Sequence, residues 1–549
     1  MDPVIEFISK FKLCVMPPQS GKTFITIKEI LAKIVEDDKY NLGRSIHIVL
    51  TMNTKIGNVQ FAKRLEEIEN TYGEGSVCVL VSGKYNGKYK HIKKREELQG
   101  ICLNKSTCPR VVVMCTNKTQ SKNEVEFLNI IDKNECCIKR AFVYYDEIHK
   151  YLNDSRRCEI EEIHNLDIVK SIIGLTATPY KTWKKEAYWS SPFWSTINIF
   201  DLNDFTTDNY VGHKDLDFHC IDDYFTDPYV RPSPFELDRQ TVEFIENVLT
   251  KYPQILDDNT RSFIPAHRHL CSHYAVRDLI FRLNNKAVVV VINGPNKTLE
   301  YNDFHGKHIT FDLSKNCDEI CKIIADFVLQ NDLQKRPYVI TGLLCISMGQ
   351  TLTDERTGSF TSAIFGHMDL LNDEIYQLFG RVKGRMKHWG DKCVRTQVYC
   401  PTIIMNRCIC GEVCAMNIIE EHNGDTITQK DFIKPIEETE EGKAIMKNIR
   451  KEKKNKNIKP KADNIEKGWK VFKLQSDAIK FGIEKLNHKF SYTMKEDAPV
   501  ELKNNGNNPT VEYILKRWWG VGKKGKPRKC ITFDNQWCVW WNESLIKNN

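Results

Sequence analysis

Short apolar runs alternate with segments of helical periodicity through residues 1–200. The runs are rich in β-branched residues and apolar on both faces, which is typical of parallel strands covered on both sides. Strand and helix in alternation predict a doubly wound α/β domain. The predicted strands are KLCVM (12–16), SIHIVLTM (45–52), SVCVLVSG (76–83), RVVVMCT (110–116), AFVYYDEIH (141–149) and SIIGLTATP (171–179).

The pattern weakens over residues 201–270, which we interpret as a linker or accessory segment containing one helix at 234–252. A second α/β pattern follows over residues 271–435, with a helix predicted at 318–331. The chain therefore predicts two tandem α/β domains with parallel sheets. The predicted strands of the second domain are AVVVVINGP (287–295), PYVITGLLCIS (337–347), TSAIFGHM (361–368) and RTQVYCP (395–401).

The C-terminal part changes character twice. Residues 436–465 are dominated by lysine, which favours a solvated linker over a nucleic-acid contact. Residues 466–549 hold six of the ten tryptophans, at positions 469, 518, 519, 537, 540 and 541, and predict a small α+β module. We expect most of these tryptophans to be core residues. The loop RWWGVGKKGKPRK (517–529) is the exception, because aromatic and basic residues together favour a nucleic-acid or protein partner.

Composition is that of a soluble globular protein, with 41% hydrophobic and 28% charged residues. No run approaches the roughly 20 apolar residues of a membrane span, and the N-terminus has no secretory signal. The net charge of +8 leans toward anionic partners. Twenty cysteines, most inside apolar runs, indicate reduced thiols and an intracellular location. The cluster Cys408, Cys410 and Cys414 matches zinc spacing poorly, so ordinary thiols are favoured over a metal site.

The first candidate for chemistry is MPPQSGKT, residues 16–23, between a predicted strand and a predicted helix. A phosphate chain needs inward backbone N–H groups, a cation and a hydroxyl for Mg²⁺. Gly21, Lys22 and Thr23 supply these, and the following helix presents its N-terminus to the phosphates. The usual pattern begins with glycine where this chain has Met16. A capped Pro-Pro turn is the alternative.

Two further strand ends carry polar residues. Asp146 and Glu147 follow an apolar run, where one carboxylate can hold Mg²⁺ and the other can polarise water. Thr176 and Thr178 flank Ala177 at the end of another run, and their hydroxyls can hydrogen-bond the acidic loop. A pair of surface acids is the ordinary alternative for the first. It suits a buried strand end poorly.

The fourth candidate is QLFGRVKGRMK in the second α/β pattern, which we expect at the start of a helix. Gln377, Arg381 and Arg385 are spaced i, i+4 and i+8, so they share one face if that helix continues. An arginine reaching the phosphate site from a second domain neutralises developing charge. A basic surface helix is an equally good interpretation of this stretch alone.

Taken in order, GKT, DEIH, TATP and QxxGR resemble the motifs of superfamily 2 helicases and translocases of the DExH type, over roughly residues 10–435. A softer likeness is to the divergent helicase-like ATPases of large DNA viruses and phages. The resemblance implies two RecA-like P-loop domains that bind ATP and Mg²⁺ between them and act on DNA or RNA. The family's second motif arginine is shifted from position 384 to Arg385, and no adenine-reading glutamine motif precedes the loop.

Roles carried over from the resemblance fall into three groups. Thr23 and Asp146 are expected to hold Mg²⁺, with Glu147 as general base and Arg381 as arginine finger. Gln377 and His149 are expected to connect the state of ATP to domain closure. The remaining expected contacts are, for ATP, Gln19, Ser20, Gly21, Lys22, Gly349 and Arg385, and, for nucleic acid or coupling, Thr51, Thr176, Thr178 and Thr351.

These features favour an ATP-driven motor that moves along or unwinds nucleic acid. A clamp or scaffold that binds ATP and nucleic acid without translocating is the alternative, motivated by Met16 and by the shifted arginine. A third possibility is the motor subunit of a larger restriction-like or transcription-termination complex. Protein partners are expected to use the C-terminal module, and we expect no membrane association. The expected location is the cytoplasm or nucleus of a host cell, or a virion.

Overall fold

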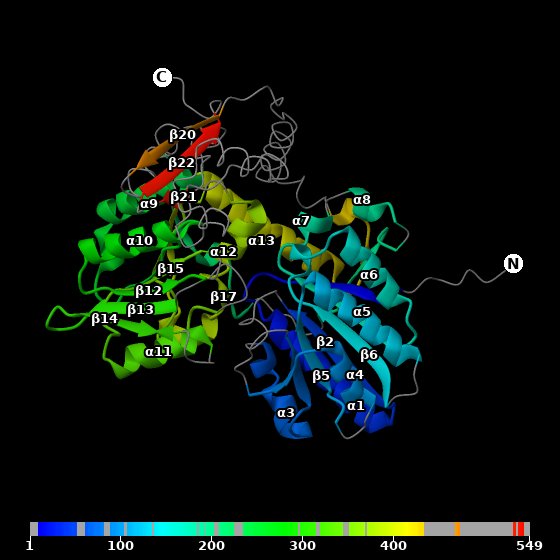
Figure 1. Ribbon diagram of the computed structural model, residues 1–549. Helices are drawn as coiled ribbons and strands as arrows, with labels where there is room; N and C mark the ends of the chain where they lie inside the picture. The colour runs from blue at the N-terminus through cyan, green and yellow to red at the C-terminus, as the bar shows by residue number, and fades with distance from the viewer. Residues whose placement is uncertain are drawn as a thin grey trace. The chain divides into compact units, whose positions relative to one another are not determined.

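The computed structural model is shown in Figure 1, and the chain divides into two compact units, residues 1–225 with 241–449 and residues 226–240 with 450–549. The residues it describes are 9–51, 61–81, 88–103, 107–133, 137–183, 186–191, 193–202, 208–223, 234–294, 297–313, 319–343, 351–367, 370–432, 467–472, 531–533 and 536–542.

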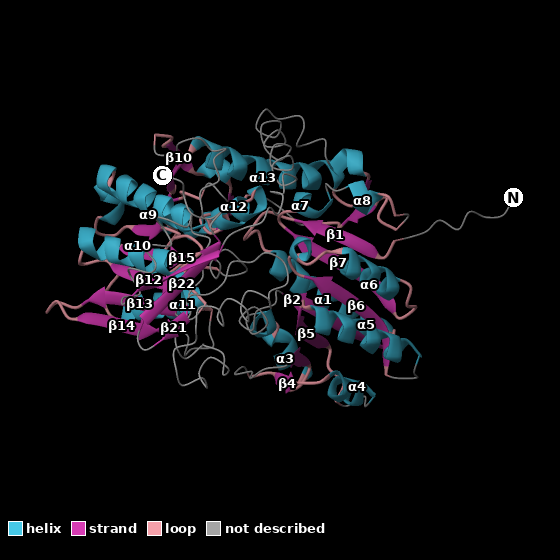
Figure 2. Cartoon of the chain, turned by 45° about the horizontal axis from the view of Figure 1, so that its top comes forward, coloured by secondary structure: helices cyan, strands magenta, loops and turns pink. Residues whose placement is uncertain are grey.

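Nine described strands form the first sheet, in the order β19-β8-β1-β7-β6-β2-β5-β3-β4. All of them pair in parallel except the short β19. Every residue of β5 is buried, as expected for a strand covered on both faces. This confirms the predicted α/β fold with a parallel sheet (Figure 2). The strands are β1 (Phe11–Val15), β2 (Arg44–Thr51), β3 (Val77–Leu80), β4 (Lys90–Ile92), β5 (Val111–Cys115), β6 (Ile138–Tyr145), β7 (Val169–Thr176), β8 (Ile197–Ile199) and β19 (Thr426–Ile427).

Amphipathic helices connect these strands. Helix α1 shows the principle, because Thr26, Ile30 and Ile34 recur at helical spacing and are buried against the sheet. The helices are α1 (Lys22–Tyr40), α3 (Glu66–Tyr72), α4 (Arg95–Leu103), α5 (Lys118–Lys133), the 3₁₀ turn η1 (Ile148–Lys150), α6 (Asp154–His164), α7 (Tyr180–Trp183) and α8 (Glu186–Trp189).

The second sheet has eight described strands in the order β10-β18-β16-β11-β15-β12-β13-β14. It is parallel except for the β13–β14 hairpin at one edge. Segment 201–270, predicted as a linker or accessory segment, supplies β10 and β11 to this sheet. The strands are β10 (Asp217–Cys220), β11 (Arg261–Phe263), β12 (Val288–Ile292), β13 (Lys297–Asn302), β14 (His308–Asp312), β15 (Tyr338–Gly342), β16 (Ser362–Ile364) and β18 (Gln397–Cys400). The helices are η2 (His213–Asp215), α9 (Pro234–Lys251), η3 (Pro253–Leu256), α10 (Leu270–Leu283), α11 (Ile320–Gln330), α12 (Asn372–Phe379) and η5 (Lys387–Lys392).

Helix α13 (Thr402–His422) belongs to the cores of both sheets. Ile404 and Cys408 pack in the core of the second sheet, whereas Ala415 and Ile418 pack in the core of the first. The chain then adds β19 to the edge of the first sheet, a return that the sequence pattern does not predict. Contrary to the expectation from the sequence, one of the described helices, α13, has the length and apolar composition of a membrane span. Its packing on both cores is that of an internal helix.

The cysteine cluster lies on α13. Cys408, Cys410 and Cys414 are buried, and the sulfur atoms of Cys410 and Cys414 are 3.9 Å apart. Lys383 Nζ donates a hydrogen bond to Cys408 Sγ at 3.0 Å. Within the ranges that the structure describes, no three His, Cys, Asp or Glu side chains form a metal-binding group.

The second unit contains a three-stranded antiparallel sheet in the order β20-β22-β21. Its strands are β20 (Lys467–Phe472), β21 (Ile531–Phe533) and β22 (Gln536–Asn542), which include four of the six C-terminal tryptophans. The loop 517–529 and the lysine-rich linker 436–465 lie outside the described residues.

Candidate nucleotide site

The predicted motifs gather at one edge of the first sheet because of strand order. Strands β1, β7, β6 and β2 are neighbours and parallel, so their carboxyl ends meet at the same edge. Residues 16–23, which we call the phosphate loop, follow β1. The threonine motif, Thr176 to Thr178, lies at the end of β7, and the acid pair, Asp146 and Glu147, follows β6. Thr51 ends β2. Ligands of open parallel sheets bind at this edge.

The loop after β1 adopts its turn without the usual first glycine. Met16 is fully buried, and its backbone N–H donates to the Thr176 carbonyl at 3.0 Å, so it continues β1. The left-handed positions fall later, at Gln19 (φ 59°) and Gly21 (φ 101°). Gly21 is the residue before α1, where the approach to a phosphate is closest. The sequence departs from the pattern at a position where this loop does not require glycine.

Lys22 points back into the loop. Its ammonium donates to the carbonyls of Met16 (3.4 Å) and Pro17 (3.2 Å), and the residue is 8% exposed. Ser20 is buried, and its hydroxyl donates to the Pro17 carbonyl at 2.6 Å. The loop therefore holds a positive charge beside the N-terminus of α1, which suits a phosphate.

A hydrogen-bonded chain links the acid pair to both neighbouring motifs. We call the parts of the first unit that surround the first and second sheets the first and second lobes. Gln377 Nε2, from the second lobe, donates to Glu147 Oε2 at 3.1 Å. His149 Nδ1 lies 3.4 Å from the same oxygen and 2.8 Å from Thr176 Oγ1, which accepts from the Thr178 N–H at 3.0 Å. All five residues are at most 7% exposed. The sequence predicts each residue, but the pairing of Gln377 with Glu147 depends on the packing of the two lobes.

Electrostatics separates the two adjacent acids. Burial and the Glu147 charge raise the pKa of Asp146 to about 7. Burial alone would raise the pKa of Glu147 too, but the charges of Lys22 and His149 outweigh it and lower that pKa. Glu147 is therefore the ionised carboxylate that can accept a proton from water, whereas Asp146 occupies a position where a cation is favourable.

Arg381 and Arg385 reach the loop in a manner different from that predicted. Helix α12 ends at Phe379, so the stretch is the end of a helix and its arginines share no helical face. Gly380 packs against Pro18, and Gly384 has φ 136° with Gln19 Cβ only 2.8 Å from where its own Cβ would lie. These two glycines let the turn approach the phosphate loop closely.

The two arginines then take separate positions. Arg385 is in the short strand β17 (Gly384–Arg385), which pairs with β9 (Tyr210–Val211), and its N–H donates to the Gln19 carbonyl at 3.4 Å. Arg381 is 4% exposed. Burial lowers its pKa to about 10, and the charge of Glu147 offsets part of that shift. Arg381 therefore interacts electrostatically with the acid pair, whereas Arg385 contacts the phosphate loop.

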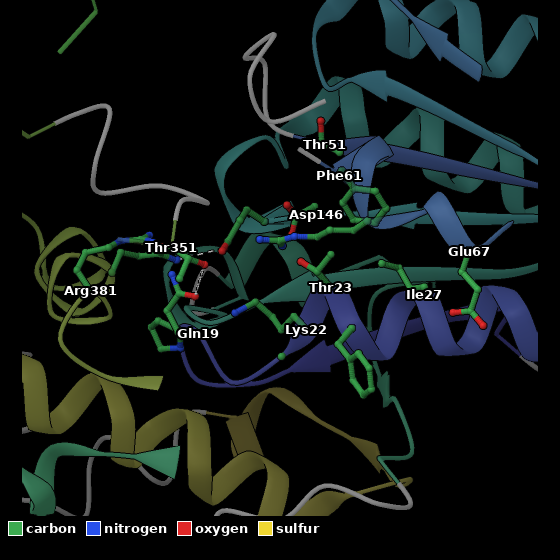
Figure 3. A pocket seen from close by; sticks show the side chains of 16 residues that line it. Gln19, Lys22, Thr23, Ile27, Thr51, Phe61, Glu67, Asp146, Thr351 and Arg381 are labelled. Carbon is green, nitrogen blue, oxygen red and sulfur yellow. Dashed lines mark hydrogen bonds between the residues drawn. The ribbon is translucent and has the colours of Figure 1, made fainter. Parts of the chain in front are cut away.

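A cavity of about 520 Å³ connects these groups (Figure 3). It is lined by most of the predicted residues and by six that sequence reasoning missed. Ser20, His149, Thr176, Thr178 and Arg385 do not line it, and Gly349 lies outside the described residues. The predicted residues are Gln19, Gly21, Lys22, Thr23, Thr51, Asp146, Glu147, Thr351, Gln377 and Arg381, and the missed ones are Pro18, Phe24, Ile27, Phe61, Arg64 and Glu67.

The first lobe supplies Lys22, Thr23 and Asp146 to this cavity, and the second supplies Arg381 (Figure 3). Thr51 was expected to touch nucleic acid, and here it lines the cavity. Thr351 Oγ1 donates to Gln19 Oε1 at 3.4 Å, which adds a second-lobe contact to the phosphate loop.

The donor set fits Mg²⁺. The Thr23 hydroxyl and the Asp146 carboxylate are hard oxygen donors on the same cavity wall. Burial and the neighbouring Glu147 charge raise the pKa of Asp146, so a cation beside this carboxylate would be favourable.

One protein-family model matches the first lobe, which carries the residues after β1 and β6. Residues 5–185, about a third of the chain, match the DEAD/DEAH box helicase family. This part of the chain is therefore similar to a DEAD/DEAH box helicase domain. No curated protein matches the sequence.

Solved structures are similar only at low identity. The DEAD-box helicase Mss116 bound to ssRNA and UDP-BeF is 11% identical, covering 82% of this chain and 78% of that one, with a TM-score of 0.40. S. cerevisiae Dbp5 bound to RNA and ADP BeF3 is 11% identical, covering 80% and 90%, with a TM-score of 0.39. The DUF1998 helicase MrfA bound to DNA is 12% identical, covering 80% and 53%, with a TM-score of 0.38. The chain thus spans about half the length of MrfA.

Proposed function

We propose that the protein is an ATP-dependent motor of the DExH type, which hydrolyses ATP between its two lobes and moves along or unwinds nucleic acid. The hydrogen bond from Gln377 to Glu147 carries this proposal, because it joins the second lobe to the general base of the first. A cavity containing both Lys22 and Arg381 supports it.

Each residue has a defined task in this mechanism. The Gly21 backbone and the Lys22 ammonium bind the phosphates, and Glu147 orients the attacking water and accepts its proton. Arg381 stabilises the negative charge that develops on the transferred phosphoryl group. Thr23 and Asp146 would hold Mg²⁺, which neutralises phosphate charge when bound.

Coupling to nucleic acid follows from the hydrogen-bonded chain. The state of Glu147 reaches Thr176 and Thr178 through His149, so a change in the cavity alters the loop after β7. Strand-end loops contact a nucleic-acid backbone without reading its sequence. Repeated opening and closing of the lobes would shift this grip along a strand.

The test is ATP turnover with a panel of single- and double-stranded DNA and RNA. We expect stimulation by at least one of them, and Lys22→Ala and Glu147→Gln should abolish turnover. Turnover by either variant at the wild-type rate would sink the proposal.

The non-translocating clamp remains the second candidate function, because the nucleotide cavity serves it equally well. Strand displacement separates the two. ATP turnover that is stimulated by nucleic acid but produces neither displacement nor translocation identifies the clamp.

A further inference from the structure

Arg64 is a cavity residue that no motif predicts. It lies in the helical turn 61–64 before α3, and it lines the same cavity as Lys22, Asp146 and Arg381. Its neighbours Phe61 and Glu67, one turn away on either side, line the cavity as well, as Figure 3 shows. This wall of the cavity thus comes from the segment after β2 and not from the phosphate loop.

The partner of Arg64 comes from the second lobe. Arg64 Nε lies 3.0 Å from Glu319 Oε1, and Glu319 is the residue that precedes α11. The side chains are 32% and 18% exposed, so the pair is neither fully solvated nor sealed. Glu319 also has Lys322 Nζ at 3.5 Å. A carboxylate with two cationic neighbours can release one of them.

Arg64 stabilises the charge of its partner carboxylate. Burial alone would raise the pKa of Glu319, but the charges and hydrogen bonds of Arg64 and Lys322 outweigh it and lower that pKa. A guanidinium presents five N–H donors in one plane and binds carboxylate and phosphate with the same geometry. A phosphate group in the cavity would therefore compete with Glu319 for Arg64.

We propose that Arg64 is a further phosphate-binding residue of the nucleotide site and that Glu319 competes with the nucleotide for its guanidinium. The inference rests on the proposed function of the cavity. Nucleotide binding then exchanges one ion pair between the lobes for a contact inside the cavity, and Glu319 acts on nucleotide affinity through Arg64.

A purely structural ion pair makes a different prediction. Ion pairs near the surface contribute little to stability, and removing either partner breaks the same contact. Arg64→Gln and Glu319→Gln would then shift nucleotide affinity in the same direction or leave it unchanged. Under the proposal the two variants change nucleotide affinity in opposite directions. Arg64→Gln removes a positive charge from the cavity, whereas Glu319→Gln frees the Arg64 guanidinium to bind the nucleotide.

The experiment uses fluorescence anisotropy to measure the Kd of a fluorescent ATP analogue for the full chain in the presence of Mg²⁺. Arg64→Gln should weaken binding about tenfold, the effect of losing one charge-assisted hydrogen bond. Glu319→Gln should tighten nucleotide binding by roughly a few-fold, because it removes the charge that competes for Arg64. The double variant should match Arg64→Gln, because Glu319 acts only through Arg64.

Two controls make the outcome decisive. Glu246→Gln removes the same charge from the ion pair with Arg282 in the second lobe, away from the cavity lining, and should leave Kd unchanged. Arg64→Lys keeps the charge and should recover part of the affinity, even if Arg64→Gln folds poorly. Equal signs for the two single variants, or no effect of either Arg64 variant, overturn the inference. Should Lys22→Ala also bind like wild type, the nucleotide function itself fails.

Discussion

The residues of the phosphate loop that adopt a left-handed backbone conformation differ from those of the usual glycine pattern. The first glycine position is occupied by Met16, which is fully buried and continues the strand. Gln19 instead holds a left-handed conformation, at φ 59°. A side chain in that conformation costs roughly 1–2 kcal/mol. In this loop the left-handed backbone conformation is therefore needed at Gln19 and not at position 16.

Met16→Ala should destabilise the protein by about 2–5 kcal/mol, because it opens a cavity in the core. Gln19→Gly is the matched change, and we expect it to stay within about 1 kcal/mol of wild type, since relief of backbone strain offsets the flexibility of glycine. Urea unfolding measures both. A tolerated Met16→Ala would show that Met16 is a loop residue and not a core residue.

Gln377→Ala should lower kcat for ATP by about tenfold to a hundredfold, because Glu147 loses the contact that orients it. The variant should also lose about 1–3 kcal/mol of stability, because a buried hydrogen bond is removed, so kcat is measured well below its melting temperature. Gln397→Ala is the matched control, because Gln397 Nε2 makes a comparable bond of 2.9 Å to Asp217 and does not line the cavity. A loss of kcat in the control as well would remove the special role of Gln377.

Residue identities at strand ends could be predicted from sequence, but their partners could not. Asp146 and Glu147 follow a recognisable apolar run, which fixes their place at the sheet edge. The contact of Gln377 with Glu147 joins residues 230 positions apart, and that of Arg64 with Glu319 joins residues 255 apart. No local pattern encodes such contacts.

Elements with long apolar runs were equally predictable, whereas short ones were not. The five-residue runs of β5 and β12 are buried throughout and read clearly as strands. Strand β11 has three residues, and its neighbours on both sides supply the burial that makes it a strand. Helix α12 ends early because glycines 380 and 384 fit against the phosphate loop, a tertiary requirement that spacing alone hides.

Helix α13 is tied to the arginine-bearing turn by a buried ion pair. Lys383 Nζ lies 2.7 Å from Glu412 Oε2, and Lys383 has no side-chain exposure. Burial alone would raise the pKa of Glu412. The Lys383 charge and the hydrogen bonds from His213 and Lys383 outweigh burial and lower that pKa to about 2. The pair thus fixes the turn between Arg381 and Arg385 on α13.

Lys383→Met should destabilise the protein by roughly 3–5 kcal/mol, because the Glu412 charge stays buried without its partner. Adding Glu412→Gln should restore much of the loss, since the amide oxygen can still accept from the His213 N–H. Thermal unfolding measures both variants. Equal stability of the single and double variants would contradict the account.

At the scale of the whole molecule, both α/β lobes lie in the first of the two compact units, with α13 in both of their cores. A nucleotide that contacts both lobes should stabilise them together. Mg²⁺ and ATP at about 100 times Kd should add about 2.7 kcal/mol to the free energy of unfolding. Lys22→Ala should abolish this gain and Arg381→Ala should reduce it, whereas the exposed Arg282→Ala should not. Calorimetry checks each, and a full gain in Arg381→Ala would place that arginine outside the nucleotide site.

The central claim is that the two lobes share one nucleotide. Single-turnover ATP hydrolysis by Arg381→Ala, with nucleic acid present and ATP saturating, tests it most directly. Loss of an arginine finger costs on the order of a thousandfold or more in rate, and we expect a loss of that size with ATP still bound. Hydrolysis by Arg381→Ala at the wild-type rate would contradict the account.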